Sequence, residues 1–290
     1  MLKNISLDDK YKLENKFILV NGTQALVRAT LIQKFRDEKE NLKTAGFVTG
    51  YRGSPVGNVD LQFSKVKKLI SEKDIKFHPG LNEDIAATSL WGSQQAEMRG
   101  ESNYDGVFGF WYGKGPGVDR SGDVFRHSNL AGTSKNGGVI AAMGDDHSGE
   151  SSTVLFQSEY AFKDAMIPIL SPSGVQELID YSILGWGLSR YAGVWVGLKC
   201  LKDTIDATEV VDGSPDKLKI IYPENPVKRG ELSIRVGDTP HAQEERLHRQ
   251  KLPAVKKFAL ENKIDREGFK KTKLSKIGII SSGKSWLDVE

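Results

Sequence analysis

The 290-residue sequence predicts an α/β fold with a doubly wound, mostly parallel sheet. Over residues 1–200, short apolar runs alternate with segments whose apolar residues recur at helical spacing, which is typical of βαβ units. Several of the apolar runs are followed by loops rich in glycine or in charged residues. In an open parallel sheet, the loops at the carboxyl ends of the strands form the ligand crevice, so these loops are the first candidates for function.

Five apolar runs are predicted strands, at residues 45–49, 75–78, 106–111, 138–143 and 194–201. Between the first two, Asn58 is the predicted N-cap of a helix in which Val59, Phe63, Val66 and Ile70 share one face. Further helices are predicted at residues 83–98, 123–131, 152–165 and 175–190. Residues 277–290 predict a strand, a glycine turn and one helical turn. Such a short unit cannot bury its apolar face, so the chain is expected to be a fragment or to be completed by a partner.

The net charge, the cysteine count and the lengths of the apolar runs exclude or disfavour several classes of function. The 41 Lys and Arg residues and 38 Asp and Glu residues give a net charge of +3, which disfavours a nucleic-acid-binding arm. The one cysteine, Cys200, excludes an internal disulfide and cannot hold an iron–sulfur cluster, which needs about four thiolates. No apolar run reaches the roughly 18–20 residues of a membrane span, and no signal peptide is recognisable, so the expected location is the cytoplasm.

Two of the four candidate loops flank the first two strands. Residues 50–58 contain three glycines that permit close backbone approach, and Ser54 precedes a helix whose N-terminal amides could hold an anion. An empty strand-to-helix turn explains this loop equally well. Residues 78–84 place Glu83 and Asp84 in the first turn of a helix, where the helix dipole alone favours acidic residues. A functional carboxylate is the alternative.

The other two loops are richer in charge. In residues 111–127, three alternate glycines with Lys114, Arg120 and Arg126 suit a phosphate or carboxylate, but the spacing does not match the dinucleotide fingerprint. Residues 144–153 gather acidic, hydroxyl and imidazole groups. A polar loop with a helix cap at Ser151 or Ser152 is favoured there over a magnesium site, so no metal site is predicted.

Two further motifs are weaker. Residues 278–285 satisfy the P-loop pattern, with Lys284 and Ser285 in place, but the β-branched pair at 279 and 280 occupies what should be loop. Cys200 ends an apolar run, which indicates a buried structural thiol rather than a nucleophile.

Five segments, in one order, resemble the N-terminal part of the long single-chain bacterial indolepyruvate ferredoxin oxidoreductases. They are residues 23–28, 44–55, 82–88, 111–123 and 144–153. The resemblance implies a thiamine-diphosphate-binding fold. It assigns residues 1–207 to the pyrimidine-binding domain, 208–273 to a connecting region and 274–290 to the truncated start of a further α/β domain.

The resemblance also implies site residues. Glu83 matches the glutamate that hydrogen-bonds the aminopyrimidine ring and so helps the cofactor to lose its thiazolium proton, while Gly53 and Asn82 are expected beside the cofactor. Substrate-binding residues are expected among Ser54, Arg52, Lys114, Arg120 and His147. Asp119 lies in the same motifs without an individual role.

The complete enzyme implied by the resemblance oxidatively decarboxylates aryl pyruvates such as indolepyruvate, forms acyl-coenzyme A and reduces ferredoxin. The chain lacks the Gly-Asp-Gly motif that holds diphosphate and magnesium, so these groups, the iron–sulfur clusters and the coenzyme A site are expected on other domains. The fragment alone is expected to be inactive, and the complete enzyme to be a homo-oligomer without nucleic-acid or membrane partners. The alternatives are a non-catalytic assembly module and a P-loop nucleotide binder.

Overall fold

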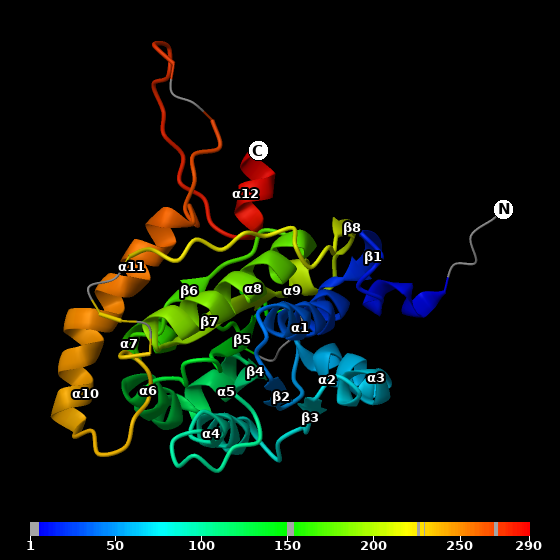
Figure 1. The fold of residues 1–290 in the computed structure, drawn as a ribbon. Helices are drawn as coiled ribbons and strands as arrows, with labels where there is room; N and C mark the ends of the chain where they lie inside the picture. The colour runs from blue at the N-terminus through cyan, green and yellow to red at the C-terminus, as the bar shows by residue number, and fades with distance from the viewer. Residues whose placement is uncertain (1–5, 150–153, 225–226, 229, 270–271) are drawn as a thin grey trace.

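The structure, a computed structural model, describes residues 6–149, 154–224, 227–228, 230–269 and 272–290. A parallel sheet of six strands, in the order β3-β2-β4-β5-β7-β6, forms its centre (Figure 1). The strands are β2 (Thr44–Gly50), β3 (Ile75–Phe77), β4 (Gly106–Lys114), β5 (Val139–Asp145), β6 (Ile169–Leu170) and β7 (Trp195–Leu201). A separate antiparallel pair joins β1 (Phe17–Asn21) to β8 (Thr208–Asp212).

Helices cover both faces of the sheet. Buried residues of α1 (Gly22–Lys39), α2 (Gly57–Lys65), α3 (Lys67–Ser71) and α8 (Val175–Ala192) form one hydrophobic cluster with the sheet. On the other face lie α4 (Glu83–Ser93), α5 (Gly115–Arg120), α6 (Gly122–Ala131) and α7 (Glu159–Asp164). The predicted doubly wound parallel sheet is therefore confirmed, and the arrangement is consistent with the thiamine-diphosphate-binding fold that the resemblance implies.

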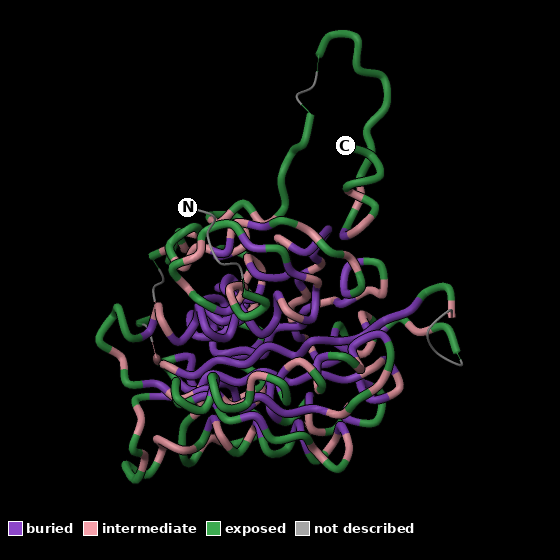
Figure 2. The backbone as a smooth tube through the Cα atoms, turned by 90° about the vertical axis from the view of Figure 1, so that its right-hand side faces the viewer, coloured by how far each residue is buried: buried purple, intermediate pink, exposed green. Residues whose placement is uncertain are grey.

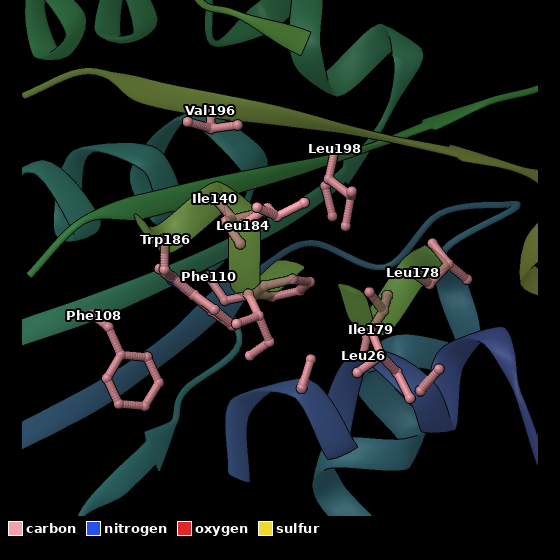
Figure 3. Close-up of a cluster of buried hydrophobic side chains, with 14 of the residues drawn as sticks. Leu26, Phe108, Phe110, Ile140, Leu178, Ile179, Leu184, Trp186, Val196 and Leu198 are labelled. Atoms are coloured by element: carbon pink, nitrogen blue, oxygen red, sulfur yellow. The ribbon is translucent and has the colours of Figure 1, made fainter. Parts of the chain in front are cut away.

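Strand alternation explains how one sheet serves two cores. Phe108 and Phe110 of β4 point to the α1 and α8 side, whereas Trp111 packs on the opposite side. Trp186 of α8 lies against both phenylalanine rings, with ring centroids 5.5 and 6.3 Å away, as the close-up in Figure 3 shows. Its indole N–H donates to the carbonyl of Gly109 at 2.9 Å, so α8 is tied directly to the central strand.

The strand order creates a switch point beside β4. From β2 the chain moves outward to β3, and it then returns across β2 to form β4. The helix after β2 packs on the α1 side, and the helices after β4 pack on the opposite side. The helices that follow these neighbouring strands therefore lie on opposite faces of the sheet, and α/β folds form a ligand crevice at such a point.

All five predicted strands are present, but several details of the prediction were wrong. Asn58 does not cap its helix: α2 begins at Gly57 after Val56, without a side-chain cap, and the helical run is interrupted at Val66. The helix predicted at 83–98 ends at Ser93. The helix predicted at 152–165 is reduced to α7, because residues 154–157 are not helical, while residues 150–153 lie outside the described part.

The short helix α9 (Lys202–Ile205) lies just before β8. Three further helices follow β8 in the described residues. They are α10 (Pro240–Arg246), α11 (Leu252–Glu261) and α12 (Lys284–Val289). A π-helical turn (Leu247–Lys251) joins α10 to α11, and a 3-10 turn (Leu7–Tyr11) precedes β1. Phe258 of α11 is fully buried against Tyr191, so this helix belongs to the main core.

The C-terminal prediction was half right. The helix after Gly283 forms, but the described residues 277–282 make no strand, and Ile277 and Ile280 are exposed. Residues 272–280, which precede this helix, are exposed and belong to the segment that projects from the body of the protein in Figure 2. Within the described residues, no helix is both long and apolar enough to cross a membrane.

Candidate functional site

Three loops meet at the carboxyl edge of the sheet around the switch point. The Gly53 backbone lies against the stem of Lys114, because a Cβ atom on Gly53 would come within 2.7 Å of Lys114 Cδ. Val56, in the same loop, packs equally closely on Gly144 at the end of β5. The Tyr51 N–H donates to the carbonyl of Tyr112 at 3.0 Å. The loops after β2, β4 and β5 thus form one packed unit.

Glu83 enters this unit from the neighbouring loop as the first residue of α4. Asn82 is the N-cap, and its side-chain oxygen accepts the Ile85 N–H at 2.8 Å. The indole N–H of Trp111 donates to the Glu83 carbonyl at 3.0 Å. Both interactions fix the backbone of Glu83, and its residue surface is only 5% exposed.

Gly117 of the Gly-Lys-Gly-Pro-Gly turn makes room for the Glu83 side chain, and Gly113 makes room chiefly for the Trp111 ring, with Glu83 beside it. A Cβ atom on Gly113 would lie 3.2 Å from Glu83 Cγ, and one on Gly117 would lie 2.5 Å from Glu83 Oε1. Gly115, between them, leaves room for the ring of Phe156 instead. A Cβ atom on Gly115 would lie 2.1 Å from Phe156 Cδ1. Each alternate glycine therefore accommodates a specific side chain, which explains the spacing that the sequence shows.

The Glu83 carboxylate has no protein partner within the part of the chain that the structure describes. Its carbonyl accepts a hydrogen bond, but its side-chain oxygens accept none and face no cation. The carboxylate of a residue this buried is usually hydrogen-bonded in folded proteins. Its position in the first turn of α4 stabilises its negative charge slightly through the helix dipole. Among the described residues, no donor therefore competes with a ligand for this carboxylate.

The end of β5 carries a second buried carboxylate, Asp145, which has a structural use. It accepts hydrogen bonds from the N–H and the hydroxyl of Ser158 at 2.8 and 2.6 Å. Burial raises the pKa of Asp145 to about 6, with a contribution from the nearby Glu159. Glu159 is in turn paired with Lys199 of β7. These contacts anchor the segment that carries Phe156, so Asp145 holds one of the protein's own turns.

The remaining predicted site residues lie on the same loops and differ in how exposed they are. Arg52 and Ser54 flank Gly53 and are exposed, and Arg120 is exposed at the end of α5. His147 is also exposed, and its Nδ1–H donates to the Phe156 carbonyl at 3.1 Å. Lys114 is half-buried. The structure thus brings Gly53 to Lys114 and Glu83 to the glycine turn.

Three residues of this site were absent from the sequence prediction as site residues: Trp111, Gly117 and Phe156. The alternate glycines were a visible signal for close packing, but the sequence did not show which side chains they receive. Phe156 gave no signal, since it follows a polar loop and belongs to no recognisable motif.

The two weaker motifs do not gain support. Cys200 is fully buried, and burial raises the pKa of its thiol, which disfavours nucleophilic use. Lys284 lies in a helix of six residues and pairs with Asp288, and the described segment before it forms no strand. A P-loop requires a strand, a phosphate-binding loop and a full helix.

Comparison with known proteins gives two similarities, while no protein-family model matches the chain. The chain is 24% identical over 265 residues to the indolepyruvate oxidoreductase subunit IorA of Methanothermobacter marburgensis, an alignment that covers 90% of this chain and 38% of that protein. Its fold is similar to that of the 2-oxoglutarate:ferredoxin oxidoreductase from Magnetococcus marinus, solved with 2-oxoglutarate, coenzyme A and succinyl-CoA bound.

The structural similarity has a TM-score of 0.59 at 13% identity and covers 86% of this chain and 46% of that chain. The chain therefore spans less than half the length of either relative. Together the two similarities confirm the resemblance to the indolepyruvate ferredoxin oxidoreductases that the five sequence segments predicted.

Proposed function

We propose that this chain, which is similar to the indolepyruvate ferredoxin oxidoreductases, is the pyrimidine-binding part of a thiamine-diphosphate-dependent 2-oxo acid:ferredoxin oxidoreductase. The observation that carries the proposal is the carboxylate of the buried residue Glu83, which is held in place and has no donor among the residues that the structure describes. The similarity to IorA over 90% of the chain supports the oxidoreductase class.

The residues present fit one half of thiamine diphosphate. A carboxylate that has no donor among the described residues matches a ring nitrogen that carries a proton, and the glycine turn gives the Glu83 side chain the room to take this position. When bound, thiamine diphosphate supplies a nucleophilic carbon that attacks the keto carbon of a 2-oxo acid. Glu83 would accept a hydrogen bond from the ring nitrogen of the aminopyrimidine and so favour the form of the ring in which that nitrogen carries a proton. Gly53 and Asn82 would line the same crevice.

Substrate would lie on the exposed side of this crevice. Ser54 and Arg52 sit on the β2 loop that packs against Lys114, and they would offer a hydroxyl and a cation to the substrate carboxylate. Arg120 and His147 would form the outer rim. Aryl pyruvates such as indolepyruvate are the proposed substrates, in keeping with the name of the relative.

The rest of the enzyme would lie on other domains or chains. Diphosphate and magnesium binding, the iron–sulfur clusters, the coenzyme A site and the ferredoxin contact are assigned there. The single cysteine of this chain and its lack of a Gly-Asp-Gly motif support that division. The chain alone is expected to turn over no substrate.

The test is Glu83→Gln in the complete enzyme, assayed by indolepyruvate-dependent reduction of ferredoxin. We expect turnover to fall about 10²- to 10⁴-fold, the range for a lost proton-transfer group. Asp84→Asn, on the same helical turn, is the matched control and should keep its turnover. Near-normal activity of the Glu83→Gln enzyme would refute the proposal. A complete protein that binds no thiamine diphosphate would favour a non-catalytic assembly module instead.

A further inference from the structure

We infer that Gly117 is a positioning residue that determines where the Glu83 carboxylate lies. A Cβ atom on Gly117 would stand 2.3 Å from Glu83 Cγ, 2.6 Å from Cδ and 2.5 Å from Oε1. All three distances are far below van der Waals contact, so the present carboxylate position exists only because residue 117 has no side chain. The catalytic consequence of this inference rests on the proposed function of Glu83.

The glycine is not needed for the backbone at this position. Gly117 lies inside α5, and it is not among the glycines with positive φ. Alanine is favoured over glycine in a helix by about 1 kcal/mol. The requirement for glycine at position 117 is therefore one of space, and the space is filled by the end of the Glu83 side chain.

The atoms that would collide with a Gly117 side chain are at the end of the Glu83 side chain, whose bonds can rotate. An added methyl group can push the Glu83 carboxylate aside by rotation about its side-chain bonds, without moving backbone or core. We therefore expect Gly117→Ala to leave the fold intact and to relocate the carboxylate.

Gly113 provides the opposite case within the same turn. A Cβ atom there would lie 2.5 Å from Cη2 of Trp111, whose ring is fully buried and held by its hydrogen bond to Glu83. The ring cannot rotate away without disturbing the core. Gly113→Ala should therefore lower the melting temperature of the chain, because overpacking a core destabilises it.

The displaced carboxylate would no longer meet the ligand nitrogen that Glu83 is proposed to serve. A misplacement of about 1 Å in a catalytic group can cost on the order of 100-fold in rate. Since the loss would act through Glu83, adding Glu83→Gln to Gly117→Ala should cost little more than Glu83→Gln alone. A purely structural defect would instead add to it.

Two measurements test the inference. The first is the ¹³Cδ resonance of Glu83 in this chain with labelled glutamate, assigned by its disappearance in Glu83→Gln. Gly117→Ala should shift this resonance without lowering the melting temperature, whereas Gly92→Ala, on α4 with open space around it, should leave the resonance in place and raise the melting temperature slightly, because alanine is favoured over glycine in a helix. The second is turnover of the complete enzyme, which should fall on the order of 100-fold in Gly117→Ala and stay normal in Gly92→Ala.

An unshifted Glu83 resonance in folded Gly117→Ala, or a chain that this substitution unfolds, would overturn the inference. So would full turnover of Gly117→Ala in an enzyme that Glu83→Gln inactivates. The proposed function fails separately, when Glu83→Gln itself keeps its turnover. In that case the resonance shift alone would still establish that Gly117 sets the position of the carboxylate.

Discussion

Two buried carboxylates at opposite edges of the same sheet are treated in opposite ways. Asp37, near the end of α1 and beside the start of β2, is 1% exposed and accepts four hydrogen bonds. Their donors are Gln33 Nε2, Thr44 Oγ1 and both terminal nitrogens of Arg190, at 2.6–2.8 Å. Glu83, at the carboxyl edge, is 5% exposed and accepts none on its side chain within the described residues.

Under the proposed function, this difference separates a structural carboxylate from a ligand-binding one within the same fold. At the amino edge, a charge that the fold buries is fully compensated, and it links α1, β2 and α8. At the carboxyl edge, glycines and an indole hydrogen bond to its backbone carbonyl position Glu83, whose carboxylate has no hydrogen-bond donor among the described residues. An arrangement of that kind is expected where a ligand completes the interaction.

The largest effect is expected at the amino edge. Asp37→Asn would leave the buried Arg190 guanidinium without its counter-charge, and it should cost about 3–5 kcal/mol in the free energy of unfolding. Denaturation by urea measures this loss. Asp216→Asn is the control, because its pair with Lys39 is more than half exposed and such pairs contribute about 1 kcal/mol at most. A loss at Asp37 no larger than at Asp216 would show that the network is not structural.

A smaller, pH-dependent effect on the free energy of unfolding is expected at Asp145. Its carboxylate accepts two hydrogen bonds, fewer than that of Asp37 and more than that of Glu83 among the described residues. Because burial raises its pKa to about 6 in the folded protein, the folded state binds a proton more tightly than the unfolded state does. The resulting stability is present below about pH 4 and is lost as the pH rises through 6, by at most about 3 kcal/mol. Asp145→Asn should flatten unfolding free energy against pH over that window. Parallel curves for the two proteins would contradict the assignment.

The five predicted strands could be recognised in the sequence because each is a run of mostly apolar residues. Helices cover both faces of the sheet, so side chains on both sides of these strands are buried. The helix α1 was missed for a physical reason: it buries Arg28, Lys34 and Asp37 along with its apolar residues, so no simple apolar stripe is visible. The two-residue β6 is too short to give a pattern, and β1 pairs with a strand far along the chain. The strand expected at 277–280 fails because no strand of the described chain lies beside it.

The sequence suggested parts of the candidate site but not how they assemble. Residue types and the family resemblance pointed to Glu83, Gly53 and Asn82, and the turn glycines were conspicuous. Distances between loops were not encoded in any local pattern, so the contacts of Glu83 with Gly117 and of Phe156 with Gly115 required the folded structure.

The most direct test of the central claim is the unfolding free energy of Glu83→Gln in this chain, measured against the unmodified chain at neutral pH. If the fold makes no use of the carboxylate, neutralising it removes a buried charge without breaking a hydrogen bond. Stability should then stay the same or rise. A loss of more than about 1 kcal/mol, approaching that of Asp37→Asn, would show that Glu83 is a structural carboxylate and would contradict the account.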